Sequence, residues 1–331
     1  MTPSDAPAPA PEAALDRVRS LLLQLQTDVI DAIDSVERAA GSKVAVVREH
    51  HALGERGESR PAVLTGGLQI EKAAVNFSAS HGHALPPAAT ARRPELAGQP
   101  FTALATSLII HPRNPWAPTT HLNLRYFSTR PASGPPTWWF GGGFDLTPSY
   151  GFVEDCRLWH KAARAAAGDD DTYAELKDWC DRYFTLPHRG ETRGVGGLFF
   201  DDWIRGGWEP SFALAERVAQ GFLPAYTAIL ARRLPMAYGE RERDWQLHRR
   251  GRYVEFNLLQ DRGTLYGLQS GRRVESVLAS MPPLVAWTYQ HTPPEDGPEA
   301  ALVPEFLRPR DWLQLGARPQ PEGAAATAQG S

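Results

Sequence analysis

The sequence lacks most of the motifs that mark common catalytic and binding classes. Only two cysteines are present, Cys156 and Cys180, and neither lies in a Cys-x-x-Cys pattern, so no redox pair or cluster site is predicted. There is no phosphate-binding loop, no G-x-G-x-x-G fingerprint, no H-E-x-x-H and no G-x-S-x-G nucleophile elbow. The absence of Cys-x-x-x-Cys-x-x-Cys excludes a radical-type iron–sulfur centre.

Long runs of apolar residues and of basic residues are also missing. No apolar run approaches the roughly 20 residues of a membrane span. With a formal net charge of −3 and no Lys/Arg run, nucleic acid is not an expected partner. The N-terminal MTPSDAPAPAPEAA has no basic segment followed by an apolar one, so it does not resemble a secretory signal. We therefore expect a cytoplasmic protein with reduced cysteines and, at 42% apolar residues, a sizeable core.

Two alternating stretches stand between Ser107 and Phe127, in SLIIHPRNPWAPTTHLNLRYF. Apolar and polar residues alternate in both halves, which is typical of half-buried strands, and the proline-rich connector 112–119 predicts a loop. If the two strands pair antiparallel, one face carries the polar side chains of Ser107, His111, His121, Asn123 and Arg125. Such a face is either exposed to solvent or a binding site, and the spacing alone favours neither.

The remaining patterns predict an α+β fold, in which helices flank one large, mainly antiparallel sheet. Helices are expected over 14–40, from Thr147-Pro148 to Ala167, and over 172–184, 211–237 and 271–281. A strand pair is expected around Gly66-Gly67, a strand at 198–200, and a second hairpin over 249–269 with its turn at Asp261-Arg262-Gly263. Residues 14–314 form the expected single domain, between disordered tails at 1–13 and 315–331.

Two motifs allow more than one interpretation. Gly141–Gly143 permits the close approach of a ligand, but a plain bend between a strand and a helix explains it equally well. His81 and His83 have the spacing of possible metal ligands, although a surface loop is the more frequent explanation. The arginines, histidines and acids beside many aromatic residues suit a large, flat ligand that carries carboxylates, because arginine pairs with carboxylate through two parallel hydrogen bonds.

At these residues the chain resembles the oxygen-dependent coproporphyrinogen III oxidases of haem biosynthesis. The resemblance extends from Ala14 to Trp312 and includes VNFSASHG, RPELAGQPF, the hairpin described above, WWFGGGFDLTPSYGF, HRGETRGVGGLFFDDW, YGERER and GRYVEFNLLQDRGTLYGLQSGRRVESVLASMPP. It implies oxidative decarboxylation of the ring A and B propionates of coproporphyrinogen III to vinyl groups. Protoporphyrinogen IX, CO2 and H2O2 would be the products, with molecular oxygen as co-substrate and no organic cofactor. It also implies a homodimer with residues 253–288 at the interface.

The resemblance further implies roles for individual residues. His121 would donate a proton, and substrate would be bound by Ser107, Asn123, Leu124, Arg125, Gly271, Arg272 and Arg273. The family usually has Gly-Gly-Arg at the last three positions, so Arg272 is either an additional carboxylate anchor or a residue facing solvent. A divalent metal such as Mn would be held by His111, His121, His160 and His188. These histidines come from two strands, a helix and a loop without a local metal signature, and catalysis without metal is the alternative.

Asp261 is the second candidate catalytic residue, expected to hold the pyrrole N–H groups and help to ionise one. Aspartate is also a common turn-forming residue, which is the structural alternative. Two other functions stay open: a tetrapyrrole carrier that has lost catalysis, and a metal-dependent oxygenase of another carboxylated aromatic compound. The presence of both His121 and Asp261 argues against the carrier.

Overall fold

An antiparallel sheet of eight strands forms the centre of the structure, a computed structural model that describes residues 12–84, 94–129, 136–269 and 273–314. The strand order is β1-β3-β4-β5-β6-β7-β10, and β2 also pairs with β3. The strands are β1 Val47–Arg48, β2 His51–Ala52, β3 Gly57–Thr65, β4 Ile70–Gly82, β5 Phe101–Pro112, β6 Thr119–Thr129, β7 Trp138–Thr147 and β10 Gly196–Trp203. A separate small ladder joins β8 Thr185–Leu186 to β9 Glu191–Thr192.

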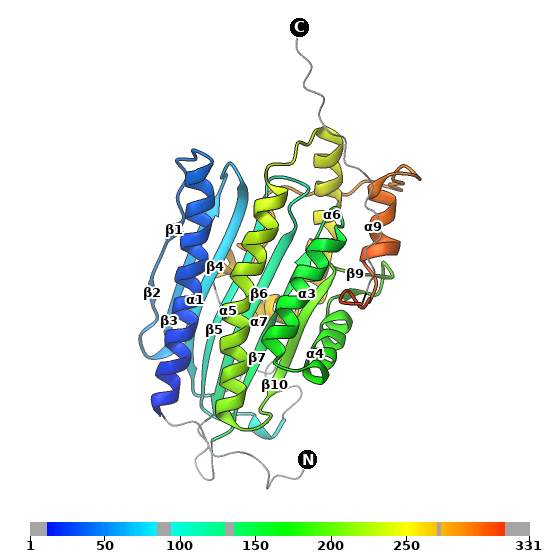
Figure 1. Ribbon diagram of the computed structural model, residues 1–331. Coiled ribbons are helices and arrows are strands. Elements are labelled where there is room, and N and C mark those ends of the chain that lie inside the picture. Colours follow the sequence, from blue (N-terminus) through cyan, green and yellow to red (C-terminus); the bar gives the residue numbers. More distant parts are fainter. Residues whose placement is uncertain (1–11, 85–93, 130–135, 270–272, 315–331) are drawn as a thin grey trace.

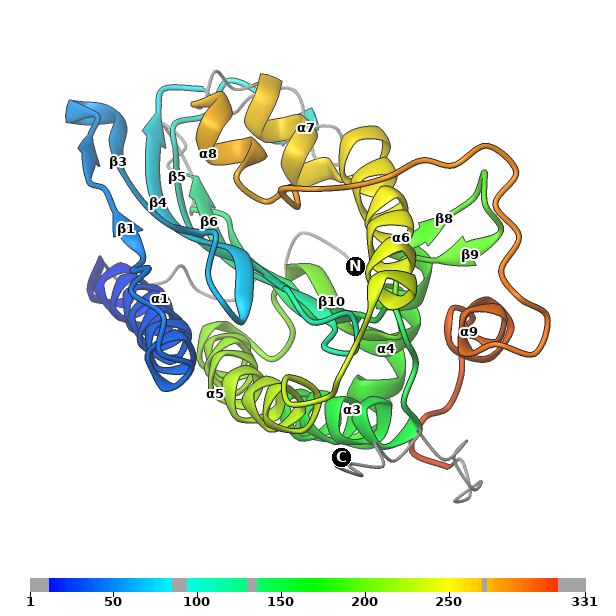
Figure 2. The same ribbon diagram turned by 90° about the horizontal axis from the view of Figure 1, so that it is seen from above.

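Helices cover both faces of this sheet (Figure 1). Their bounds are α1 Glu12–Ala39, α3 Val153–Ala167, α4 Asp170–Tyr183, α5 Trp208–Arg233, α6 Glu240–Leu259, α7 Arg262–Gln269, α8 Val274–Leu278 and α9 Pro298–Phe306, with short 3-10 turns η2 Gly54–Arg56 and η3 Pro94–Leu96. Figure 2 shows α1, α5 and α3 on one side of the sheet and α6, α7 and α8 on the other. None of the described helices is long and apolar enough to cross a membrane.

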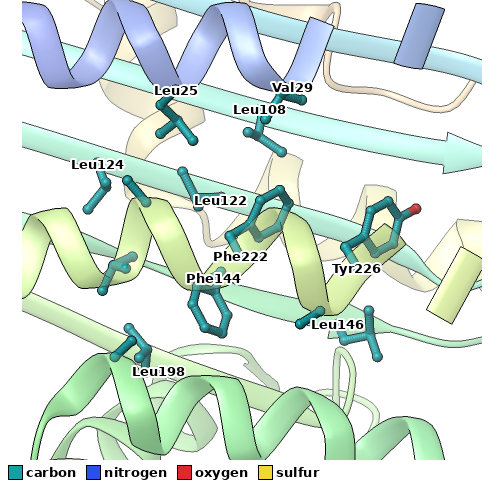
Figure 3. Packing of buried hydrophobic residues seen from close by; sticks show 14 of the residues in the cluster. Leu25, Val29, Leu108, Leu122, Leu124, Phe144, Leu146, Leu198, Phe222 and Tyr226 are labelled. Carbon is teal, nitrogen blue, oxygen red and sulfur yellow. The ribbon is translucent and has the colours of Figure 1, made fainter. Parts of the chain in front are cut away.

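The main hydrophobic core lies between the sheet and the layer formed by α1, α5 and α3 (Figure 3). Leu122 and Leu124 of β6 point into it, where Leu122 lies beside Phe222 of α5, while Leu25 and Val29 enter from α1. Because side chains alternate along a strand, the residues between these leucines must face the other side of the sheet. One face of β6 therefore stabilises the fold, and its opposite face is available for chemistry.

Most of the predicted elements are confirmed. The central hairpin is β5 and β6, paired antiparallel with Ser107 opposite Asn123. The strand pair around Gly66-Gly67 is β3 and β4, the strand at 198–200 lies within β10, and the predicted helices over 14–40, 172–184 and 211–237 are α1, α4 and α5. The short helix predicted for 271–281 is observed as α8. The tails fall largely outside the described residues.

Two local predictions are wrong. Residues 249–269 form no hairpin, but the end of α6 and all of α7. The alternation around Tyr253 covers too few residues to distinguish a strand from a helix, whereas Trp245, Arg249 and Tyr253 repeat at the four-residue spacing of a buried helical face. The carboxylate of Glu242 also caps this helix by accepting the Gly239 N–H at 2.7 Å. Thr147 does not start a helix, since it ends β7 and α3 begins at Val153.

Candidate active site

The polar side chains predicted for the hairpin lie together on the sheet face opposite the main core. Asn123 pairs with Ser107 of β5 on one side and with Gly143 of β7 on the other. His121 pairs with Ile109 and Asp145, and Arg125 pairs with Ala105 and Gly141. Ser107, His121, Asn123 and Arg125 are half-buried, in contrast to the fully covered leucines between them. His111, also predicted for this face, is fully buried against Tyr253 of α6. α6, α7 and α8 border this face, which we call the polar face (Figure 2).

The His121 ring contacts Asp145, which forms a buried ion pair with Arg193. Its Nδ1 lies 3.0 Å from Oδ1 of Asp145, and the Arg193 guanidinium donates to both oxygens of that carboxylate, at 2.8 and 2.9 Å. The side chains of Asp145 and Arg193 are each 1% exposed, whereas that of His121 is 25% exposed. Since Nδ1 is taken by Asp145, Nε2 is the ring nitrogen of His121 that can exchange a proton with a bound molecule.

The charge of Asp145 is maintained although burial opposes it. Burial alone raises the pKa of this carboxyl, but the Arg193 guanidinium and the His121 ring together bring the pKa below its usual range. Arg193 lies over the rings of Phe184, Tyr253 and Phe256, with its guanidinium carbon 4.2 to 5.0 Å from their centroids. Aromatic faces attract a cation, so this enclosure stabilises the buried guanidinium.

A second charged group lies further along β6. Arg125 donates through Nη1 to Oδ1 of Asn123 at 2.7 Å and through Nη2 to Oδ1 of Asp201 at 2.8 Å. The other oxygen of Asp201 accepts from Nη2 of Arg262, at the start of α7, at 3.0 Å. Burial acts to raise the pKa of Asp201, but Arg125 and Arg262 lower it to about 2. Asp201 is thus an ionised carboxylate shared by two guanidiniums.

Asp261 has a structural role in this arrangement. Its Oδ2 accepts from the backbone N–H of Thr264 at 2.8 Å and from the Thr264 hydroxyl at 2.9 Å, which caps the first turn of α7. Its Oδ1 accepts from the Tyr183 hydroxyl at 3.0 Å, and burial together with the neighbouring Asp261 raises the pKa of Tyr183 to about 12, so this hydroxyl remains a donor. Contact between Asp261 and a pyrrole N–H stays a prediction.

Several predicted substrate-binding residues lie elsewhere. The Leu124 side chain is buried in the main core, so side-chain contact with a ligand on the polar face is ruled out (Figure 3). Alternation along β6 turns the Leu124 side chain away from the face that carries Asn123 and Arg125, so a contact of Leu124 with substrate stays a prediction for its backbone alone. Arg273 lies at the far edge of the sheet, where Nη1 contacts His51 and, at 3.2 Å, Glu49. Gly271 and Arg272 fall outside the described residues.

The four predicted metal ligands do not come together. Among the described residues, no three His, Cys, Asp or Glu side chains form a group that could hold a metal ion. The ring nitrogens of His111 contact the Thr119 hydroxyl and the Ser280 carbonyl, and those of His160 contact the Tyr173 hydroxyl and the Val195 carbonyl. Burial lowers the pKa of both histidines, that of His160 to about 3, so these rings are neutral members of the packed interior.

His188 is engaged separately, with its Nε2 2.9 Å from Glu255 on α6. His121 contacts none of the other three and is held by Asp145 instead. The donor set implied by the resemblance therefore does not fit a metal within one subunit.

Three residues of the site were not identified from the sequence: Asp145, Arg193 and Asp201. Each lies in one of the motifs quoted above, but its partner is distant in the chain. Asp145 lies 24 positions from His121, Arg193 lies 48 from Asp145, and Asp201 lies 76 from Arg125. An acid two positions after Gly143 was the one available signal for Asp145, because a glycine strand beside polar β6 residues leaves space for a carboxylate.

The family model described as coproporphyrinogen III oxidase matches residues 17–312. The chain belongs to the coproporphyrinogen III oxidase family. It is accordingly an enzyme of haem biosynthesis, an oxidative decarboxylase whose family substrate is coproporphyrinogen III. The match also spans all of the strands and helices that build the polar face. The arginine-bearing surface is consistent with that substrate, which carries four propionate groups around a macrocycle.

Proposed function

We propose that this enzyme uses molecular oxygen to convert the ring A and ring B propionates of coproporphyrinogen III to vinyl groups. Each propionate would consume one O2 and yield CO2 and H2O2, so two rounds give protoporphyrinogen IX. The observation that carries the proposal is the polar face of β6, where Arg125 and His121 lie four positions apart on the same side of the strand, in a chain of this family.

Binding of substrate would rest on Arg125, Asn123 and Ser107. Arg125 uses two donors for Asn123 and Asp201 and retains others for a propionate, since guanidinium has five N–H groups. Each charge-assisted bond of this kind contributes about 1.5–3 kcal/mol. Ser107 and Asn123 face each other across β5 and β6 and offer a hydroxyl and an amide beside the guanidinium. These groups would hold one edge of the macrocycle against the sheet.

The proposed reaction consumes protons, which gives His121 a role beside the groups that bind the substrate. An ionised propionate, one O2 and one proton give one vinyl group, one CO2 and one H2O2, so each round consumes a proton. Loss of CO2 leaves its electron pair to form the new C=C bond, while O2 accepts two electrons from the electron-rich pyrrole. His121, held through Nδ1 by Asp145, would supply the proton from Nε2. The ionised Asp145 would stabilise the imidazolium form that donates it.

The positioning of these groups supplies most of what the reaction needs from the protein, since the reactive macrocycle itself provides the electrons. A divalent ion is not required by this proposal. We also propose that Asp261 contributes through α7, whose first turn it caps and whose Arg262 it places beside Asp201.

Association as a homodimer through residues 253–288 is part of the same proposal. Large apolar side chains are exposed along this part of the surface, namely Leu258, Leu259, Leu268, Val274, Leu284 and Trp287. Contiguous exposed apolar surface is typical of interfaces between subunits. A cytoplasmic location is supported by the two cysteines, which are buried and free.

The decisive experiment is turnover of coproporphyrinogen III in air by enzyme that has been stripped with a chelator and analysed for residual metal. Formation of protoporphyrinogen IX with CO2 and H2O2 supports the proposal. Product that appears only after a divalent ion is restored would refute metal-independent catalysis and require a site between subunits. Binding of the oxidised porphyrin without turnover in either condition would instead indicate a carrier.

A further inference from the structure

Strand β10 contains an irregularity at the polar face. Phe200 pairs with Gly142 and Trp203 pairs with Phe140, so β10 has one residue more than β7 over this span. Asp202 in this bulge has a φ of +50°, a left-handed conformation that few residues other than glycine adopt. As a result, both Phe200 and Trp203 reach the main core while Asp201 faces Arg125. Bulges commonly redirect a side chain beside an active site.

Strand β7 makes room for the same carboxylate. A Cβ on Gly141 would lie 2.7 Å from Nε of Arg125 and 2.8 Å from Oδ1 of Asp201. Any side chain at this position would therefore push the ion pair away from the sheet. The bulge in β10 and the glycine in β7 are independent features of the chain, and both serve the contact between Arg125 and Asp201.

The second guanidinium at Asp201 is also held in place. Arg262 lies over the ring of Tyr183, with 5.3 Å between the guanidinium carbon and the ring centroid, and its backbone N–H donates to the Tyr183 hydroxyl at 3.3 Å. Tyr183 is in turn stacked on Phe199 of β10, with ring centroids 4.2 Å apart and planes at 11°. The Arg262 side chain nevertheless remains 43% exposed, so its unused donors are accessible.

We propose that Asp201 is a positioning residue, which holds Arg125 and Arg262 as one paired guanidinium site for a single carboxylate of the substrate. Two cations and one fixed anion leave a net charge of +1 on the group, which one propionate neutralises. Without the Asp201 charge, the two guanidiniums repel each other, and the more exposed Arg262 turns to solvent. This inference rests on the proposed function, because it assigns how the same site recognises carboxylate.

The test compares the Asp201→Asn variant with the wild-type enzyme. We expect KM for coproporphyrinogen III to rise about tenfold to a hundredfold with kcat little changed, as expected for loss of one charge-assisted contact. Binding of coproporphyrin III and of its tetramethyl ester, followed by fluorescence, supplies a readout that a purely structural role would not move. The wild-type preference for the free acid should fall by a similar factor, because the ester has no carboxylate charge.

Two further variants disturb the contacts of Asp201 from β7 and from α7. Gly141→Ala should reproduce the change in KM and in the acid preference with Asp201 intact. Arg262→Gln, at an exposed helix position, should fold normally and do the same. Asp178→Asn removes an aspartate paired with Arg182 on the exposed surface of α4 and serves as the control with the same change in net charge. It should leave both quantities unaltered.

The outcomes separate this inference from the proposed function. An Asp201→Asn enzyme with wild-type KM and acid preference would overturn the inference, as would equal losses of acid and ester binding, which would indicate a structural role only. Should Asp201→Asn fail to fold, Arg262→Gln decides, and an unchanged acid preference there overturns the paired site. Absence of turnover by the wild-type enzyme would refute the proposed oxidase, while the comparison of acid with ester binding would still test the guanidinium pair.

Discussion

The Asp145→Asn variant tests the central ion pair of the site. The substitution preserves shape but removes the charge that Arg193 faces, and Arg193 is 1% exposed and enclosed by three rings. Removing one partner of a buried pair costs about 3–5 kcal/mol, because the remaining charge has no compensation. At about 1.5 °C per kcal/mol for a chain of this size, the melting temperature should fall by about 4–8 °C.

Asp145→Asn should also lower kcat, independently of its effect on the melting temperature. An asparagine at this position no longer stabilises the imidazolium form of His121, so we expect kcat to fall by about 10²–10⁴-fold below the new melting temperature. Calorimetry measures the first effect, and aerobic turnover followed by porphyrin fluorescence measures the second. The Asp178→Asn control should stay within about 0.5 kcal/mol of wild type. If Asp145→Asn melts within 2 °C of wild type and turns over normally, the ion pair supports neither the fold nor the reaction.

Three other predictions concern the sheet around the site. Leu124→Ala should destabilise the protein by about 2–5 kcal/mol without raising KM. Arg125→Gln should raise KM and destabilise the protein less than Leu124→Ala, because Asp201 keeps its contact with Arg262. Denaturant titration and steady-state kinetics distinguish the two variants, and the opposite assignment would contradict the facing of β6. Gly143→Ala should prevent pairing of β7 with β10, because its Cβ would lie 2.1 Å from the Leu198 carbonyl oxygen at a φ of +140°, whereas Gly221→Ala meets nothing closer than 3.7 Å and should fold; soluble yield and circular dichroism report this difference. The pKa of Asp201 is depressed to about 2, so its stabilisation is complete above about pH 4 and is lost as the pH falls towards 2. The gap in denaturation midpoint between wild type and Asp201→Asn should therefore close over that range, and a gap that stays constant would show that Asp201 does not titrate in this way.

The central hairpin could be predicted because its pattern is local. Period-two alternation over both halves identifies which residues share a face, and antiparallel pairing then brings Ser107, His121, Asn123 and Arg125 together. The same rule also predicts that the Leu124 side chain points away from the polar face, into the main core.

The partners of these residues could not be predicted from local patterns. Asp145 and Asp201 reach the polar face through the register of β7 and β10, and Arg193 through the short connection between β9 and β10. Strand register across a sheet depends on contacts distant in sequence. The prediction of a hairpin over 249–269 was wrong for another reason. A window of six alternating residues fits both a strand and a helix, and only the packing of Trp245, Arg249 and Tyr253 over a longer span distinguishes them.

The division of β6 into two faces has a consequence for how this enzyme can be altered. Along residues 121–126, odd positions carry the groups proposed to meet substrate, and even positions carry leucine and tyrosine of the core. A library restricted to odd positions of β6 would vary acceptance of differently carboxylated tetrapyrroles while leaving the folding core untouched. A library restricted to even positions would select thermostability without redesigning recognition. Two engineering goals that usually compete are here separated by a single residue step along one strand.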